Sequence, residues 1–212
     1  MHSNEACPVG GDDGAARRPG YGEGRQALVD AAIRLVAREG VPKLTYRSLT
    51  AEAGVSQGSL RHHFPHLIGV LEAALESCLD VSKAYMEQPK EQLQGLLAHT
   101  ARLMHDRPEI PAFLAEVYIV ARHTPELLEI VRRHQQHYRD RVEAALAVVG
   151  LTVDDALVDA VLAMGDGLMY QRVIFGEGHE ETTRRQVAGS QRLLMALLFK
   201  ERVGDIGRHL QD

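Results

Sequence analysis

Apolar residues recur at intervals of three and four positions along most of this chain, and no segment of any length alternates apolar and polar residues. A repeat near 3.6 residues places side chains on one face of a helix, whereas a half-buried strand needs a repeat of two. The spacing therefore predicts an all-α fold without a sheet. The clearest stripe consists of Leu128, Val131, Gln135, Tyr138, Val142, Ala145 and Val149.

Prolines, glycines and capping residues divide this helical pattern into segments. Thr45 and Ser56 are good N-caps, and Gly54 suits a tight turn because glycine accepts a positive φ. Residues 1–21 are rich in glycine and aspartate, and we expect them to form a disordered arm. We predict helices at 23–38, 45–54, 56–63, 66–86, 90–106, 108–122, 125–149, 153–175 and 180–202.

The 212 residues carry a net charge of −5, but this charge is unevenly distributed. Residues 17–67 contain eight arginines and lysines against four acids, which gives them a net charge of +4 and leaves −9 for the rest. A basic end on an acidic body is typical of a protein that presents one end to nucleic-acid phosphates.

Other compositional features exclude several classes of protein. Cys7 and Cys78 are too few for a disulfide framework, and no apolar run approaches the ~20 residues of a membrane-spanning helix. The first residues are polar and lack the apolar region of a secretory signal. We therefore expect a cytoplasmic protein that does not enter a membrane.

Residues 44–64 have the pattern of a helix-turn-helix. This motif needs a small residue before the turn, a glycine within it and an apolar residue after it, and residues 53–55 (Ala-Gly-Val) supply them in order. The second helix is short enough to enter a DNA major groove. It would present Gln57, Ser59, Arg61 and His62 outward.

The same stretch resembles the signature of the TetR family of transcriptional regulators. The shared pattern over 45–65 is T-x-R-x-L-x-x-x-A-G-V-S-x-G-S-L-x-x-H-F-P, and the preceding A-A-x-x-L-V-A-R-E-G also matches. Agreement extends over about residues 24–75. The later runs P-E-L-L-E, Y-R-D-R-V and M-G-D-G-L resemble the C-terminal domain of BetI-like members of the family.

The resemblance implies a three-helix DNA-binding domain at 22–67 and a helical-bundle domain at 68–212 for ligand binding and dimerisation. The recognition helix would span 56–63, with Arg61 as the main base reader because a guanidinium can bond both acceptors of guanine. Arg17 and Arg18 would be able to enter the minor groove. The residues expected at the DNA are Thr45, Tyr46, Arg47, Ser56, Gln57, Gly58, Ser59, Arg61, His62 and His63.

One position departs from the family pattern. The family usually has a lysine three residues after the phenylalanine, where it holds a phosphate, and this chain has Leu67. Either Leu67 serves packing, or another cation such as protonated His66 takes the place of the lysine. Loss of one phosphate contact would lower the salt dependence of DNA binding by about one unit.

The remaining two thirds of the chain would bind an unknown small-molecule effector and a second copy of the chain. The effector candidates have polar tips or adaptable shapes, and Arg122 or Asp166 would suit ligands of opposite charge. They are Met104, Phe113, Tyr118, Arg122, Tyr138, Met164, Met169 and Tyr170. The dimer would form through the last two helices, whose apolar stripes are Leu157, Val161, Met164 and Leu168, and Val187, Leu193, Leu194, Leu197 and Leu198.

We find no pattern for catalysis, a cofactor or a metal. The eleven histidines, including His134 and His137 on one predicted helix, lack companions at ligand spacing. The expected function is therefore a dimeric regulator, in the form of a repressor, that binds a palindromic operator on double-stranded DNA and is released by its effector. The alternative is a small-molecule-binding helical bundle without specific DNA binding.

Overall fold

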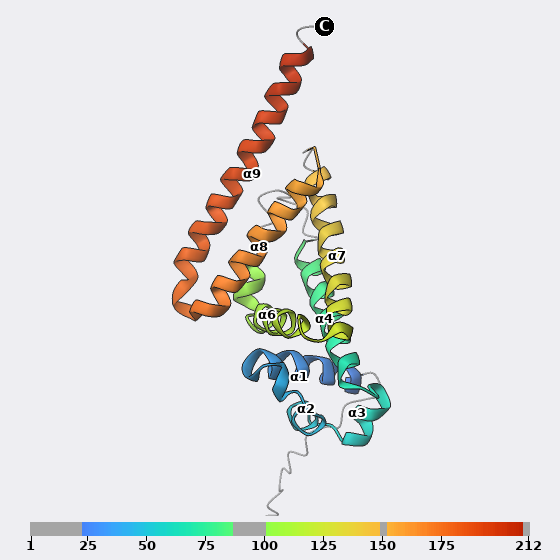
Figure 1. Cartoon of the computed structure of the whole chain (residues 1–212). Coiled ribbons are helices and arrows are strands. Elements are labelled where there is room, and N and C mark those ends of the chain that lie inside the picture. Colours follow the sequence, from blue (N-terminus) through green and yellow to red (C-terminus); the bar gives the residue numbers. More distant parts are fainter. Residues whose placement is uncertain (1–22, 87–100, 149–151, 210–212) are drawn as a thin grey trace, which may run out of the picture.

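The computed structural model describes residues 23–86, 101–148 and 152–209, and within them it contains helices and no strand (Figure 1). The predicted arm at 1–21 and the predicted helical residues 90–100 lie outside the described residues. Figure 1 shows α2 and α3 at one end of the molecule and the C-terminal half of α9 at the other.

The observed helices agree with the predicted segments to within two residues at nearly every boundary. They are α1 (Glu23–Glu39), the 3₁₀ helix η1 (Val41–Lys43), α2 (Tyr46–Ala53), α3 (Gln57–His63), α4 (Leu67–Met86), α6 (Glu109–Ala121), α7 (Pro125–Val148), α8 (Asp155–Phe175), the 3₁₀ helix η2 (Gly176–His179) and α9 (Glu180–His209). Residues 101–106 are also helical. The exception is α9, which continues seven residues past the predicted end at 202.

Local side-chain contacts fix the ends of α2 and α3 as predicted. The Thr45 hydroxyl accepts from the Ser48 amide at 3.1 Å, and the Ser48 hydroxyl accepts from the Thr45 amide at 2.9 Å. Gly54 ends α2 in the left-handed conformation, with φ of 68°. The Ser56 hydroxyl accepts from the Ser59 amide at 3.1 Å and starts α3. These caps satisfy backbone amides that the helices leave unpaired.

A single apolar core runs through both halves of the chain. Helix α1 buries Leu28, Leu35 and Val36 completely or almost so, and it packs against α2, α3, α4 and, most extensively, α6. Leu67 is partly buried and packs against this core, which agrees with the packing alternative for that position. The core thus crosses the predicted domain boundary between 67 and 68, and that boundary stays a prediction.

One close approach across this boundary lies at the end of α1. Gly40 has φ of 83°, a conformation that L side chains rarely adopt. A Cβ atom at this position would lie 3.0 Å from Oε2 of Glu116 on α6. The absence of a side chain at Gly40 therefore lets the end of α1 approach α6.

Candidate nucleic-acid interface and interior polar cluster

Helix α3 is anchored by one face and exposes the other. Leu60 is fully buried against the core, and Phe64 at the C-cap is 5% exposed. Gln57, Gly58, Arg61 and His62 are exposed, while Ser59 and His63 are half-buried. Three of the four residues predicted to point outward, Gln57, Arg61 and His62, are therefore exposed, whereas Ser59 is partly covered.

Tyr46 at the start of α2 supports Arg61. The Arg61 Cζ atom lies 5.4 Å from the centre of the Tyr46 ring, and the Tyr46 hydroxyl donates to the Pro65 carbonyl oxygen at 2.6 Å. The hydroxyl hydrogen of Tyr46 is therefore directed at Pro65, and the ring forms a platform for the guanidinium. A DNA contact by Tyr46 stays a prediction.

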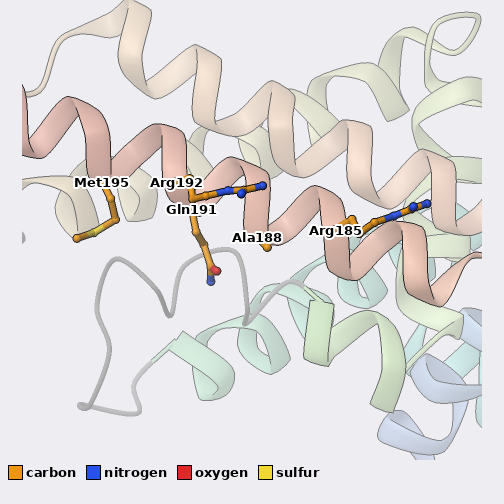
Figure 2. A pocket seen from close by; sticks show the side chains of 5 residues that line it. All are labelled: Arg185, Ala188, Gln191, Arg192 and Met195. Carbon is orange, nitrogen blue, oxygen red and sulfur yellow. The ribbon is translucent and has the colours of Figure 1, made fainter.

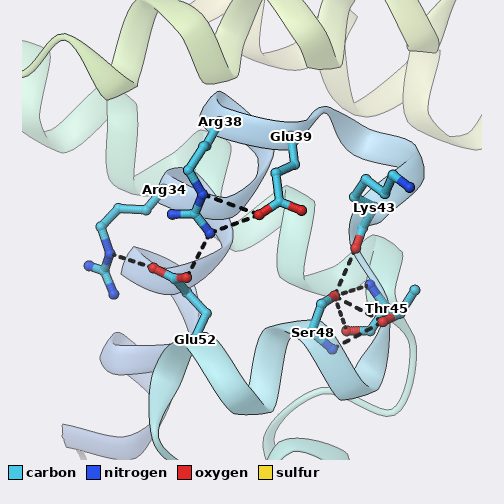
Figure 3. A network of polar contacts seen from close by, with 7 residues as sticks. All are labelled: Arg34, Arg38, Glu39, Lys43, Thr45, Ser48 and Glu52. Atoms are coloured by element: carbon cyan, nitrogen blue, oxygen red, sulfur yellow. Dashed lines mark hydrogen bonds and ion pairs between the residues drawn. The ribbon is translucent and has the colours of Figure 1, made fainter.

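Ion pairs link α1 to α2, the first helix of the motif (Figure 3). Glu52 on α2 lies between two arginines of α1, with Arg34 Nε at 3.2 Å and Arg38 Nη2 at 2.9 Å. Arg38 also contacts Glu39 at 3.0 Å. Hydrogen bonding from Arg38 lowers the pKa of the Glu52 carboxyl, which keeps it charged. Two of the basic residues in this part of the chain are thus neutralised by acids within the protein.

The first turn of α1 lies beside the recognition helix, a contact that the sequence analysis did not predict. A Cβ atom at Gly24 would lie 3.5 Å from His63 Nε2 and 3.7 Å from Ser59 Oγ. The Arg25 Cζ atom lies 5.0 Å from the centre of the Phe64 ring. From the sequence alone, Arg25 contributes only to the net positive charge of residues 17–67. The way α1 packs against α3 cannot be predicted from either helix by itself.

Polar side chains gather in the interior of the bundle, in a group that we call the polar cluster. The Tyr118 hydroxyl and His134 Nδ1 are 2.7 Å apart, and the Ser82 and Tyr138 hydroxyls are 2.6 Å apart. The Tyr118 and Tyr138 rings lie 5.9 Å and 5.1 Å from the His134 ring. The cluster consists of Ser82, Tyr118, His134, Tyr138, Asp166 and Tyr170.

Burial dominates the electrostatics of the polar cluster. It raises the pKa of Tyr138 to about 12 and raises the pKa of Tyr118 as well. Burial also raises the pKa of Asp166, whose negative charge acts on the Tyr118, Tyr138 and Tyr170 hydroxyls. No arginine or lysine of the described residues forms an ion pair with Asp166. The cluster thus combines aromatic rings with one partly buried carboxyl, and the positive charge of Arg141 also acts on His134 and Tyr138.

The predicted effector residues separate into different environments. Tyr118, Tyr138 and Tyr170 belong to the polar cluster, whereas Met104, Phe113 and Met169 are buried in the apolar core. Met164 lines a groove between α8 and α9. Arg122 is exposed at the C-cap of α6. Ser82 is not among the residues predicted from the sequence, and His134 appears there only beside His137 on one helix, without a predicted role.

Helix α9 borders two grooves. The first, of about 390 Å³, lies between α8 and α9 and is almost wholly apolar, with Leu157, Met164, Leu193 and Leu197 among its lining residues. The second, of about 590 Å³, follows another face of α9 (Figure 2). The residues that line this groove are Arg185, Ala188, Gln191, Arg192 and Met195. The side chains of the two arginines point in the same direction along the helix.

Two family models match this chain. Residues 28–74 match the model described as bacterial regulatory proteins of the tetR family, and residues 88–197 match the tetracyclin repressor-like C-terminal domain. The second match alone spans more than half of the chain. The chain belongs to the TetR family. It is therefore a DNA-binding transcriptional regulator, as the sequence predicted.

Individual relatives agree with this assignment. The regulator BetI of Rhizobium meliloti (strain 1021) is 28% identical over 153 residues, which cover 68% of this chain and 75% of BetI. A transcriptional regulator from Rhodococcus sp. Rha1 has the same fold, with a TM-score of 0.69 and 22% identity over 83% of this chain and 96% of the other. The multidrug binding protein EbrR, complexed with imidazole, has a TM-score of 0.56 and 26% identity over 82% of this chain and 88% of its own.

Two further findings concern the described residues of this TetR-family chain. They include no group of three or more histidine, cysteine, aspartate or glutamate side chains placed to hold a metal ion. None of their helices combines the length and the hydropathy that crossing a membrane requires.

His134 gives a pH-dependent prediction. The side chain is 3% exposed, and burial lowers its pKa from 6.5 to about 4, so the folded protein keeps the ring neutral. As the pH falls, the unfolded chain protonates this histidine before the folded protein does. The stability of the folded state that is present above pH 6.5 is therefore lost as the pH falls toward 4. The difference in unfolding free energy between pH 7 and pH 4 should be larger, by on the order of 3 kcal/mol, for the wild type than for His134→Gln. Urea unfolding at fixed protein concentration measures both, and equal pH dependence would contradict the prediction.

Proposed function

We propose that this regulator is a homodimeric repressor that reads a palindromic operator through α3 and is released by a small-molecule effector. The observation that carries the proposal is a recognition helix fixed at both ends, with Leu60 buried beneath it and Arg61 exposed above it. The DNA-binding unit would be residues 22–67, and residues 68–212 would bind the effector and the second copy.

In this proposal Arg61 bonds guanine in the major groove, and the other exposed residues of α3 lie near base edges. Thr45, Arg47 and His63 flank the groove and contact phosphates, which set register without reading sequence. A helical bundle that binds small molecules without specific DNA recognition is the rival proposal. Sequence preference, rather than DNA binding as such, separates the two.

Arg61→Ala should reduce the preference for the operator over random DNA by ~1–3 kcal/mol, because the guanidinium is proposed to read a base. The operator is first selected by the wild-type protein from a random duplex library, and fluorescence anisotropy then gives both affinities. Arg132→Ala, which removes an exposed arginine of α7, is the matched control and should change neither. An unchanged preference in Arg61→Ala would remove this residue from base reading, and a library without enrichment would favour the rival proposal.

The proposed dimer forms at the apolar groove between α8 and α9. Leu193 is 64% exposed and Leu197 is 42% exposed, and both line the groove. Phe175 and Phe199 are 61% and 71% exposed. So much apolar surface on two adjacent helices is typical of an interface, and a second copy of the same helices would cover it by two-fold symmetry. Leu194 of the predicted stripe is only 2% exposed and therefore packs within its own protomer.

Leu197→Arg should convert the dimer into monomers and weaken operator binding with it, because a charge would enter an apolar interface. Sedimentation velocity at micromolar concentration measures the assembly, and circular dichroism checks that the helices remain. Ile119→Arg, at an apolar residue of α6 that is 54% exposed, is the control and should leave the dimer intact. A monomeric wild type would contradict the proposed dimer.

The polar cluster is the proposed effector site. Asp166 lies in a partly buried environment with the rings of Tyr118, Tyr138 and Tyr170 near it, and a bound cation would stabilise its carboxylate and contact the rings. The EbrR structures contain imidazole in one case and proflavin in another. We therefore propose that the effector carries a positive charge.

Small organic cations should raise the melting temperature of the wild type, and carboxylates of matched size should not. Organic cations should no longer raise the melting temperature of Asp166→Asn. They should still raise that of the control Asp140→Asn, which changes an exposed residue of α7. A cation that binds should weaken operator binding, and operator should weaken binding of the cation by the same factor, because linkage is reciprocal. Equal cation affinity with and without operator would contradict a coupled effector site.

A further inference from the structure

The recognition helix has two flanks, and a different helix lies along each of them. Residues two apart on a helix point about 200° away from each other. Arg61 contacts Tyr46 of α2, whereas Ser59 and His63 lie beside Gly24 in the first turn of α1. The starts of α2 and α1 thus border opposite sides of α3.

A helix in the major groove lies between two phosphate backbones, because the groove is only about 12 Å wide. The flank at α2 carries Arg47 as an exposed cation. On the other flank, the described cation next to α3 is Arg25, which follows Gly24 directly and is exposed. The position of α1 therefore brings one guanidinium to the second backbone.

Arg25 is also available for such a contact. Arg34 and Arg38 of the same helix are paired with Glu52, but within the described part of the chain no acid forms an ion pair with Arg25. Its guanidinium lies over the Phe64 ring, with Cζ 5.0 Å from the ring centre. Stacking uses the face of the guanidinium and leaves the N–H groups at its edge able to donate to phosphate oxygens.

We propose that Arg25 donates to a DNA phosphate on the α1 side of the recognition helix, with Phe64 holding its guanidinium in place. This inference rests on the proposed insertion of α3 into the major groove. It assigns a phosphate contact to a chain that has the partly buried Leu67 in the motif position where a lysine is usual. The contact contributes affinity and salt dependence, and it reads no base.

The test measures the affinity of the full-length protein for a duplex selected by the wild type and for a random duplex at several salt concentrations. Arg25→Gln should lower the slope of log K against log salt by about one unit per protomer on both duplexes. Arg25→Lys keeps the charge and should retain most of the slope. Arg34→Gln, on the same helix but directed at Glu52, should leave the slope unchanged. Thermal unfolding of each variant shows whether the domain remains folded.

The outcomes separate this inference from the proposed function. An unchanged slope in Arg25→Gln overturns the phosphate contact, and if Arg61→Ala still loses sequence preference, the proposed function stands. If His66→Gln lowers the slope and Arg25→Gln does not, the phosphate contact belongs to the exposed His66, and the inference about Arg25 is overturned. If Arg25→Gln loses preference for the selected duplex while keeping its slope, Arg25 reads a base and the inference is also overturned. Because random DNA reports the slope by itself, the inference is decided even if no sequence is enriched.

Discussion

The burial of α1 is the interaction on which the rest of the structure depends. This helix packs against both helices of the DNA-binding motif, against α4 and against α6 of the bundle. Its fully buried leucines and valines each contribute about 1.5–3 kcal/mol relative to exposure. The recognition helix therefore has its position set by the same core that contains α6. Helix α4 joins the two halves along the chain, and the α1–α6 contact is a second connection between them.

The electrostatic surface of the motif differs from what a charge count suggests. The clustering of arginines and lysines predicted an end that faces DNA, but Arg34 and Arg38 of this cluster pair with Glu52 and link α1 to α2. Arg25, Arg47 and Arg61 are exposed, and they lie in the first turn of α1, at the start of α2 and on α3. The arginines that acids of the protein do not neutralise are therefore fewer than the count implies, and they occupy defined positions.

Local chemistry explains which parts were predictable from sequence. Thr45, Gly54 and Ser56 act on neighbours a few residues away, so their roles follow from the residue types and spacing. The polar cluster did not follow, because Ser82 and Tyr138 are 56 positions apart and meet only through the packing of α4 against α7. The apolar stripe of α9 was also ambiguous, since Leu194 and Leu197 differ in burial although both fit a helical repeat. Periodicity finds the apolar face of a helix but does not tell which of its residues the same chain covers.

The contact of Gly40 with Glu116 limits how this protein is able to diverge. Two independent requirements select glycine there, a positive φ and the 3.0 Å that a Cβ would leave to the Glu116 carboxylate. Any other residue at position 40 would strain the backbone, and its Cβ atom would lie 3.0 Å from the Glu116 carboxylate, so this side chain would have to shift. The backbone at the α1–α6 junction therefore restricts position 40 to glycine, whereas no residue of α3 has a positive φ and its exposed positions carry no such requirement.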